Sequence, residues 1–217
     1  MKRVYVYCEG QTEETFINKI LRPYFCRVDI AVIPIVCTTS YTPTKKYKGG
    51  VSSYGKIRRE LAALCKNQYR SGGYVTTMFD YYAMPKDTPG IDCDEPDIQK
   101  RIEIIEEAIN SDIQQQNFRF HFMLHEFEGI LFSNPNSFCK IADESVVREI
   151  RAVKDEHLTP EHINNSPNTA PSKRLERLIP DYKKIANGIS LAEDMGIDVI
   201  MKECPHFRQW IQMIKSW

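Results

Sequence analysis

Alternating hydrophobic and polar patterns run through the first half of the chain. Short runs rich in β-branched and aromatic residues predict strands, and apolar residues at helical spacing predict helices between them. The predicted strands are residues 4–8, 28–37, 74–79 and 118–124, and the predicted helices are 12–23, 56–69 and 98–109. Strands that alternate with helices favour an α/β fold with a mostly parallel sheet covered by helices on both faces.

The second half of the chain changes to an interrupted helical pattern. Helices are predicted at residues 137–141, 145–156, 173–184, 189–195 and 206–217. A polar stretch at residues 159–172, rich in proline and asparagine, predicts a loop or mobile lid. We therefore expect an α/β core over residues 1–133 and a helical extension packed on it over residues 134–217.

Composition narrows the classes of protein that fit this pattern. The chain has 217 residues, 42% of them hydrophobic, and a formal net charge of zero. Passive nucleic-acid-binding proteins are strongly basic, and this chain is not. Any site for a polyanion must therefore be a local patch of positive charge. No long apolar run or signal peptide is visible, so we expect a soluble, cytoplasmic protein with no membrane contact. The seven scattered cysteines indicate reduced thiols, and no recognisable zinc-binding set is present.

Acidic residues stand where three predicted strands end. Glu9, Asp80 and Glu126 each follow an apolar run. The carboxyl ends of parallel strands meet at one edge of a sheet, which is where ligands bind in open α/β folds. Hard cations such as Mg²⁺ prefer carboxylate oxygens, so these residues predict a cation site. The alternative for Glu13 and Glu14, in the first turn of the next helix, is that they only complement its dipole.

Three segments stand out together: Glu9-Gly10-Gln11-Thr12-Glu13, Phe79-Asp80-Tyr81-Tyr82 and the run from His125 to Ser133. They resemble a bacterial Toprim-like family of unknown function, family 4276, related to the Toprim nuclease domain of OLD-type proteins. The similarity continues through Lys173-Arg174-Leu175, Tyr182-Lys183-Lys184, Gly188 and Cys204-Pro205-His206-Phe207 to Trp210. The resemblance implies a Mg²⁺- or Mn²⁺-dependent nuclease, with a possible ATPase partner protein and a role in defence against phage.

The resemblance also implies roles for individual residues. Glu9 matches the Toprim glutamate, Glu13 matches the second glutamate of the OLD-type motif, and Asp80 matches the first aspartate of the Asp-x-Asp motif. Tyr82 stands in place of the second aspartate, which puts the binding of two metal ions in doubt. Candidates for the missing ligand are Glu126 or Glu128, with Asp87, Asp92 and Asp94 as weaker substitutes. Candidates for a catalytic lysine beside the scissile phosphate are, in order, Lys184, Lys183 and Lys173.

A segment after the second predicted strand interleaves cations with aromatic residues. Its candidate nucleic-acid-binding residues are Lys45, Lys46, Tyr47, Lys48 and Lys56. Such a loop can bind phosphates while its rings stack on unpaired bases. The alternative is a solvated loop whose lysines have no such role.

Two other functions fit the same residues. The chain can be a catalytically inactive Toprim-like subunit that docks an ATPase, and the missing second aspartate is the argument for it. Asp80 can also be a phosphoacceptor, as in receiver-like domains. The sequence contains neither a Walker loop nor a Gly-x-Ser-x-Gly elbow, which argues against ATP use or a serine nucleophile within this chain.

Overall fold

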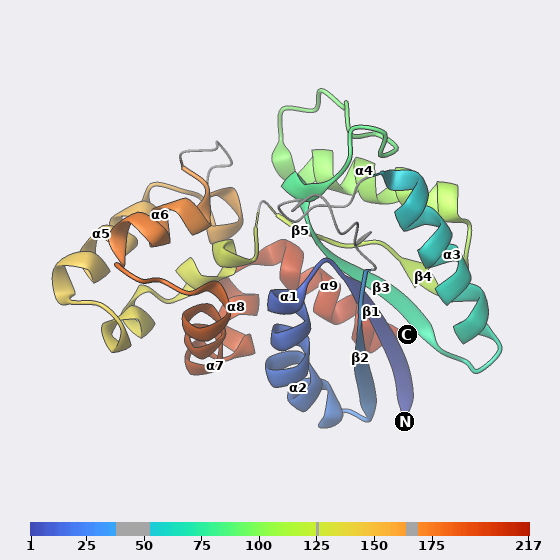
Figure 1. The fold of residues 1–217 in the computed structure, drawn as a ribbon, viewed down its shortest axis with the longest axis horizontal. Coiled ribbons are helices and arrows are strands. Elements are labelled where there is room, and N and C mark those ends of the chain that lie inside the picture. The colour runs from blue at the N-terminus through green and yellow to red at the C-terminus, as the bar shows by residue number, and fades with distance from the viewer. Residues whose placement is uncertain (38–52, 125, 164–168) are drawn as a thin grey trace, which may run out of the picture.

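The computed structural model describes residues 1–37, 53–124, 126–163 and 169–217 (Figure 1). Its centre is a five-stranded parallel sheet with the order β2-β1-β3-β4, and β5 pairs with the end of β3. The strands are β1 (Lys2–Cys8), β2 (Ile30–Val36), β3 (Tyr74–Asp80), β4 (Phe118–Arg119) and β5 (Phe122–Met123). The α/β fold with a mostly parallel sheet is therefore confirmed.

Alternate residues of the central strand enter two separate hydrophobic cores. Val4, Val6 and Cys8 belong to one core, and Tyr7 belongs to the core on the opposite face. The period of two in β1 thus places apolar side chains on both faces of the sheet. This is the arrangement expected for a strand covered by helices on each side.

Helices from distant parts of the chain cover each face. The helices α3 (Tyr54–Tyr69) and α4 (Ile98–Ile113) supply the core that contains Tyr7. The other face is covered by α1 (Gln11–Phe16), α2 (Arg22–Cys26) and the C-terminal α9 (Pro205–Ser216) (Figure 1). On α9, Trp210 donates a hydrogen bond of 2.9 Å from Nε1 to Oγ1 of Thr76 in the middle of β3.

The first helical segment passes through Pro23, so the prediction that it ends near this residue is wrong. A π-helical segment, η1 (Ile17–Leu21), lies between α1 and α2. The backbone N–H of Arg22 donates to the carbonyl of Ile17, five residues earlier. This wider turn comes directly before Pro23, whose ring clashes with the carbonyl four residues back in a regular helix. The chain therefore continues as a helix without breaking.

The predicted strand at residues 118–124 is divided into β4 and β5, so the prediction of a single strand is wrong. Between them, the N–H of His121 donates to Oγ1 of Thr77 at 2.7 Å. The same hydroxyl donates to the carbonyl of His121 at 2.9 Å. The N–H of Phe122 donates to Oε1 of Glu106 on α4 at 2.7 Å. Side chains thus replace the ladder hydrogen bonds at this point.

The second half is helical, as predicted, with different boundaries. It contains the helices α5 (Glu144–Asp155), α6 (Pro171–Leu178), α7 (Ile189–Met195) and α8 (Ile197–Glu203). Of these four, only α8 has no counterpart among the predicted helices. The 3-10 segments are η3 (Phe127–Ser133), η4 (Pro135–Lys140) and η5 (Pro160–His162). The prediction of a helix at residues 173–184 is wrong, because α6 ends at Leu178. Pro180 disfavours helical backbone at the residue before it, which accounts for this end. Residues 164–168 of the predicted lid lie outside the described part.

The order of the strands places a topological switch point between β1 and β3. The chain leaves β1 to form β2 on one side, and then crosses to form β3 on the other side of β1. In open α/β sheets, ligands bind outside the carboxyl ends of the strands at such a switch point. In this protein the switch point lies between the ends of β1 and β3.

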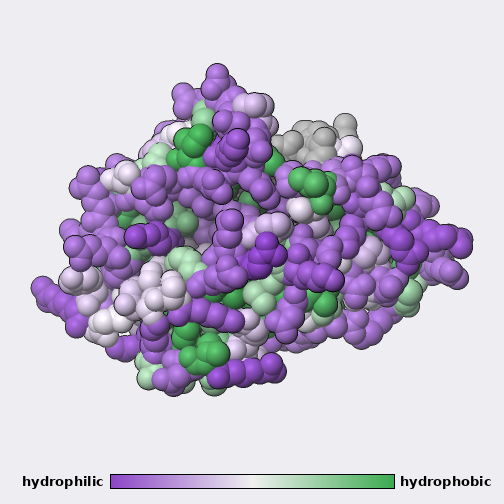
Figure 2. All heavy atoms as spheres, turned by 180° about the vertical axis from the view of Figure 1, so that it is seen from behind, coloured by the Kyte–Doolittle hydropathy of each residue, from purple (hydrophilic) through white to green (hydrophobic). Residues whose placement is uncertain are grey.

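The face of the molecule seen from behind is mostly hydrophilic (Figure 2). Seen from behind, Figure 2 shows hydrophobic residues as separate groups on a largely polar face. Among the helices described, none is both long enough and apolar enough to cross a bilayer.

A buried glutamate connects α9 to the rest of the fold. Glu161 in η5 accepts hydrogen bonds from the N–H groups of His206 at 3.0 Å and Phe207 at 2.8 Å. Only 4% of its surface is exposed. The carboxylate therefore satisfies donors that the first turn of α9 leaves without helical partners.

We predict that Glu161→Ala lowers the free energy of unfolding by about 2 kcal/mol, because two buried N–H groups lose their acceptor. Urea denaturation followed by circular dichroism measures this change. The matched control is Glu149→Ala, at an exposed position of α5. Equal stability of the two variants would contradict the capping role of Glu161.

Candidate functional site

Two of the predicted acids lie at the switch point. Glu9 directly follows β1, and Asp80 is the last residue of β3. The register pairs Cys8 with Met78, so both acids leave the sheet at the same edge. The negative charge of Glu9 acts on Asp80. The structure therefore brings these two of the three predicted strand-end acids together at one edge of the sheet.

Glu13 joins this group from the first turn of α1. Its Oε2 accepts a hydrogen bond of 2.9 Å from the N–H of Gly10, and the side chain is 8% exposed. Glu13, rather than its neighbour Glu14, thus forms the backbone cap of the helix. This bond uses one carboxylate oxygen, and the negative charge still acts on Glu9 and Asp80.

The segment after β5 brings a further acid, and η6 (Lys184–Gly188) brings a lysine. The N–H of Phe127 donates to Oδ1 of Asp80 at 3.1 Å, which fixes the start of η3 against the end of β3. The next residue, Glu128, is completely buried. Nζ of Lys184 lies 3.0 Å from Oε2 of Glu128. This is an ion pair by distance, but within the described residues neither carboxylate oxygen of Glu128 makes a well-directed hydrogen bond.

Glu126 occupies a different position from Glu128. Its Oε2 accepts a hydrogen bond of 3.0 Å from the N–H of Ser172 in the first turn of α6. Of the two residues, it is Glu128 whose charge acts on Asp80. Glu126 therefore lies at the rim of the group and stabilises a helix, while Glu128 faces its interior.

Burial shifts the proton equilibria of the whole group. Burial, together with the charge of Glu13, raises the pKa of Glu9 to about 7. Burial and the charges of Glu13 and Glu9 raise the pKa of Asp80 well above its ordinary value. The pKa values of Glu13 and Glu128 are also raised, chiefly by burial. A cation placed among such acids would favour their ionised forms.

Lys184 is held at the group by local backbone structure. It begins a π-helical turn, η6 (Lys184–Gly188), in which Asn187 accepts the N–H of Lys183 at 2.7 Å through its side chain. At Gly188, a Cβ atom would lie 3.0 Å from the hydroxyl of Tyr182, so the close approach favours glycine. Burial alone lowers the pKa of Lys184, but the adjacent Glu128 outweighs it and the pKa rises to about 12.

The other lysine candidates lie elsewhere. Lys183 is exposed, and Lys173 forms an exposed ion pair of 2.6 Å with Glu176. Lys56, in the first turn of α3, lies 3.9 Å from Glu60. The remaining predicted nucleic-acid-binding residues, Lys45, Lys46, Tyr47 and Lys48, fall outside the described residues, as does His125.

A second group of possible ligands was not predicted from the sequence. Glu106, His121 and His206 offer ligand atoms that all lie within 4.8 Å of one another. The two imidazole rings are nearly parallel, however, with an interplanar angle of 20° and centroids 4.7 Å apart. Lone pairs in the planes of facing rings run side by side instead of converging on one ion. The group instead forms a buried contact between α4, α9 and the sheet, in which Nε2 of His206 lies 3.1 Å from Oε1 of Glu106.

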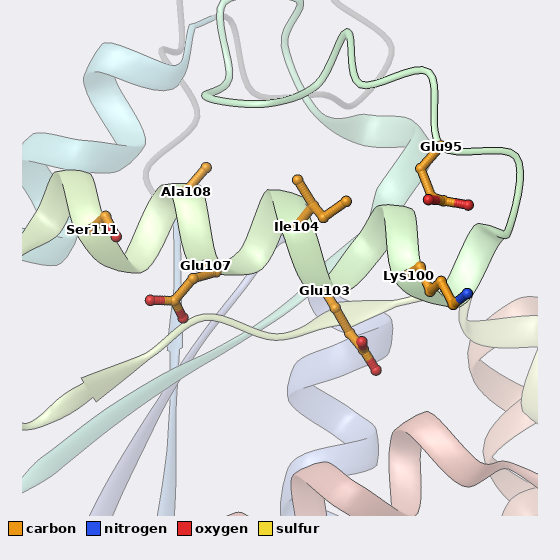
Figure 3. A pocket seen from close by; sticks show the side chains of 7 residues that line it. All are labelled: Glu95, Lys100, Glu103, Ile104, Glu107, Ala108 and Ser111. Carbon is orange, nitrogen blue, oxygen red and sulfur yellow. The ribbon is translucent and has the colours of Figure 1, made fainter.

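The surface also has a shallow pocket along the outer face of α4. Figure 3 shows its lining residues, which include Glu95, Glu103 and Glu107 around the exposed Ile104. No member of the acidic group at the switch point lines it. The candidate chemistry therefore belongs to the strand ends and not to this pocket.

Comparison with known proteins adds one finding. A family model described as a domain of unknown function, DUF4276, matches residues 8–215. The chain belongs to the DUF4276 family. Neither the curated proteins nor the solved structures contain a match to it. The DUF4276 match spans Glu9, Glu13, Asp80, Glu128 and Lys184, so the residues of the site all lie within the family domain.

We predict that the metal-free protein loses stability as the pH rises through the interval between the ordinary value of 4.5 and about 7. In this interval the folded state keeps the proton on Glu9 that the unfolded state has released, so stability falls with increasing pH. In the Glu9→Gln variant, we expect a shallower slope of unfolding free energy against pH, smaller by the equivalent of up to one bound proton. Urea denaturation in the presence of a chelator, at about pH 5 to about pH 7, measures the slope. Glu149→Gln is the control, and a slope unchanged by Glu9→Gln would show that Glu9 ionises normally.

Proposed function

We propose that this protein is a metal-dependent nuclease of Toprim type that cleaves phosphodiester bonds of nucleic acid. The observation that carries the proposal is the meeting of Glu9, Glu13, Asp80 and Glu128 with Lys184 at the switch point of a parallel sheet. Carboxylates and one cation at such an edge are suited to holding a divalent metal ion next to a phosphate.

The acidic group fits Mg²⁺ or Mn²⁺. Glu13 and Asp80 each give one oxygen to a backbone N–H, which leaves the second oxygen for a metal ion. Within the described residues, Oε1 of the buried Glu128 has no hydrogen-bond partner. No three of these four acids bring carboxylate oxygens within 4.8 Å of one another, as the ligand atoms of Glu106, His121 and His206 are. Wider spacing suits Mg²⁺, which keeps several water ligands and binds few carboxylates directly.

Glu128 is the best candidate for the carboxylate missing at Tyr82. Glu126 is engaged with the first turn of α6, whereas Glu128 is buried beside Asp80 and Lys184. When bound, the metal ion would activate water and screen the charge of the phosphate. The chain's own contribution would be to surround the ion with Glu9, Glu13, Asp80 and Glu128, some of them through its water ligands. Lys184 supplies a positive charge for the oxyanion that develops during cleavage.

The second candidate function is an inactive subunit that docks an ATPase. Tyr82 in place of an acid favours it, and so does the use of Glu13 as a helix cap. An ATPase partner is compatible with both functions. The two candidates differ in a measurable way, because only a nuclease needs the acids for cleavage.

We predict that the protein cuts nucleic acid with Mg²⁺ or Mn²⁺ and that Glu9→Gln and Asp80→Asn each reduce the rate by at least about 100-fold. The loss is expected because each change removes a negative charge that holds the ion. Purified protein is incubated with plasmid, single-stranded DNA and transfer RNA, each with Mg²⁺, Mn²⁺ or chelator.

Glu149→Gln and Asp155→Asn are matched controls at exposed positions of α5. Both should cut at the normal rate. Normal cutting by Glu9→Gln and Asp80→Asn would exclude the proposed site. Absence of cutting by the unaltered protein on all substrates, with a stable partner complex, would favour the docking subunit.

A further inference from the structure

The ion pair between Lys184 and Glu128 joins two side chains of very different accessibility. Glu128 is completely buried, and 41% of the Lys184 side chain is exposed. A buried carboxylate without compensation is costly, so the ammonium group of Lys184 neutralises a charge that the fold has placed out of water. Because the two carboxylate oxygens of Glu128 lack well-directed hydrogen bonds among the described residues, this charge is the main favourable interaction they have.

Lys184 acts on the other acids as well. Its charge lowers the pKa of Glu9, Glu13 and Asp80 relative to what burial alone would give. The ammonium group therefore stands in the metal-free protein where a divalent cation would have its effect. A lysine and a metal ion that neutralise the same carboxylates compete with each other.

The geometry points to a metal-dependent exchange at Glu128: Lys184 pairs with Glu128 in the metal-free protein, and a divalent cation bound by Glu9 and Asp80 takes over Glu128 and releases the lysine. This inference rests on the proposed function. The released ammonium group is then available for a phosphate oxygen of the nucleic acid. The exchange makes a positive charge for the substrate available only after the metal ion has bound.

The two partners differ in their freedom to move. Glu128 lies in η3, whose residues from Phe127 to Ser133 are all buried. Lys184 has a long, flexible aliphatic stem and reaches the acids from the surface. The lysine is therefore the partner that leaves, and the carboxylate stays in place to receive the metal ion.

A double-mutant cycle on metal affinity tests the exchange. Calorimetric titration with Mn²⁺ at about pH 8, where protons compete less with the metal, compares the unaltered protein with Lys184→Met, Glu128→Gln and the double variant. Lys184→Met keeps most of the stem and removes the charge. We expect it to strengthen Mn²⁺ binding roughly tenfold, because the competitor for Glu128 is gone. We expect Glu128→Gln to weaken binding, and we expect Lys184→Met to have much less effect in that background.

The outcomes separate this inference from the proposed function. If Lys184→Met strengthens binding equally with and without Glu128→Gln, the lysine acts only through its field and the exchange is wrong. If Glu128→Gln leaves Mn²⁺ affinity unchanged, Glu128 is not a ligand and the exchange is also wrong. Absence of Mn²⁺ binding by the unaltered protein would instead overturn the proposed function itself. Lys183→Met, at the exposed neighbouring position, is the control and should not change the affinity.

Thermal melting establishes that each variant is folded before titration. Should Glu128→Gln fail to fold, Glu128→Asp retains the charge on a shorter side chain. The exchange then predicts weaker Mn²⁺ binding and a smaller effect of Lys184→Met in that background. Unchanged values for both would contradict it.

Discussion

Like charges held close together out of water are the constraint on which the candidate site depends. Glu9, Glu13, Asp80 and Glu128 lie near one another because β1 pairs with β3, and because β5, which pairs with the end of β3, leads into η3. Burial disfavours ionisation of all four acids, and Lys184 offsets part of that cost. Repulsion by neighbouring acids adds to the cost at Glu9, Asp80 and Glu128. The fold can accommodate this electrostatic cost because each carboxylate also has a structural contact or a counter-charge. Under the proposed function, a bound metal ion would offset this cost and so stabilise the fold.

Backbone N–H groups orient some of these carboxylates and not others. Gly10 donates to Glu13 and Phe127 donates to Asp80, so each side chain is oriented by one oxygen and presents the other. Glu126 is oriented in the same way, but by the first turn of α6, at the rim of the group. Glu128 has no such donor among the described residues. Its position depends on the buried η3 segment and on the ion pair with Lys184.

Sequence patterns predicted the parts of the site that depend on local order. The strand ends at Glu9 and Asp80 follow from the apolar runs before them, and the parallel sheet follows from the alternation of strands and helices. The choice between Glu126 and Glu128 could not be made, because neighbouring residues of an irregular segment have no fixed period. The contact of Glu106 with His206 joins residues 100 positions apart, and the division of the fourth strand depends on side chains from β3 and α4. Contacts of this kind are set by tertiary packing and leave no local signal.

The proposed function gives a physical reason for a tyrosine at position 82. In the proposed site the additional carboxylate comes from η3, where Oε2 of Glu128 lies 3.0 Å from Nζ of Lys184. Glu128 and its lysine together would add a carboxylate to that site without adding net negative charge. An acid that comes with its own cation can be buried completely, as Glu128 is, whereas an acid at the position of Tyr82, which is 39% exposed, would face solvent.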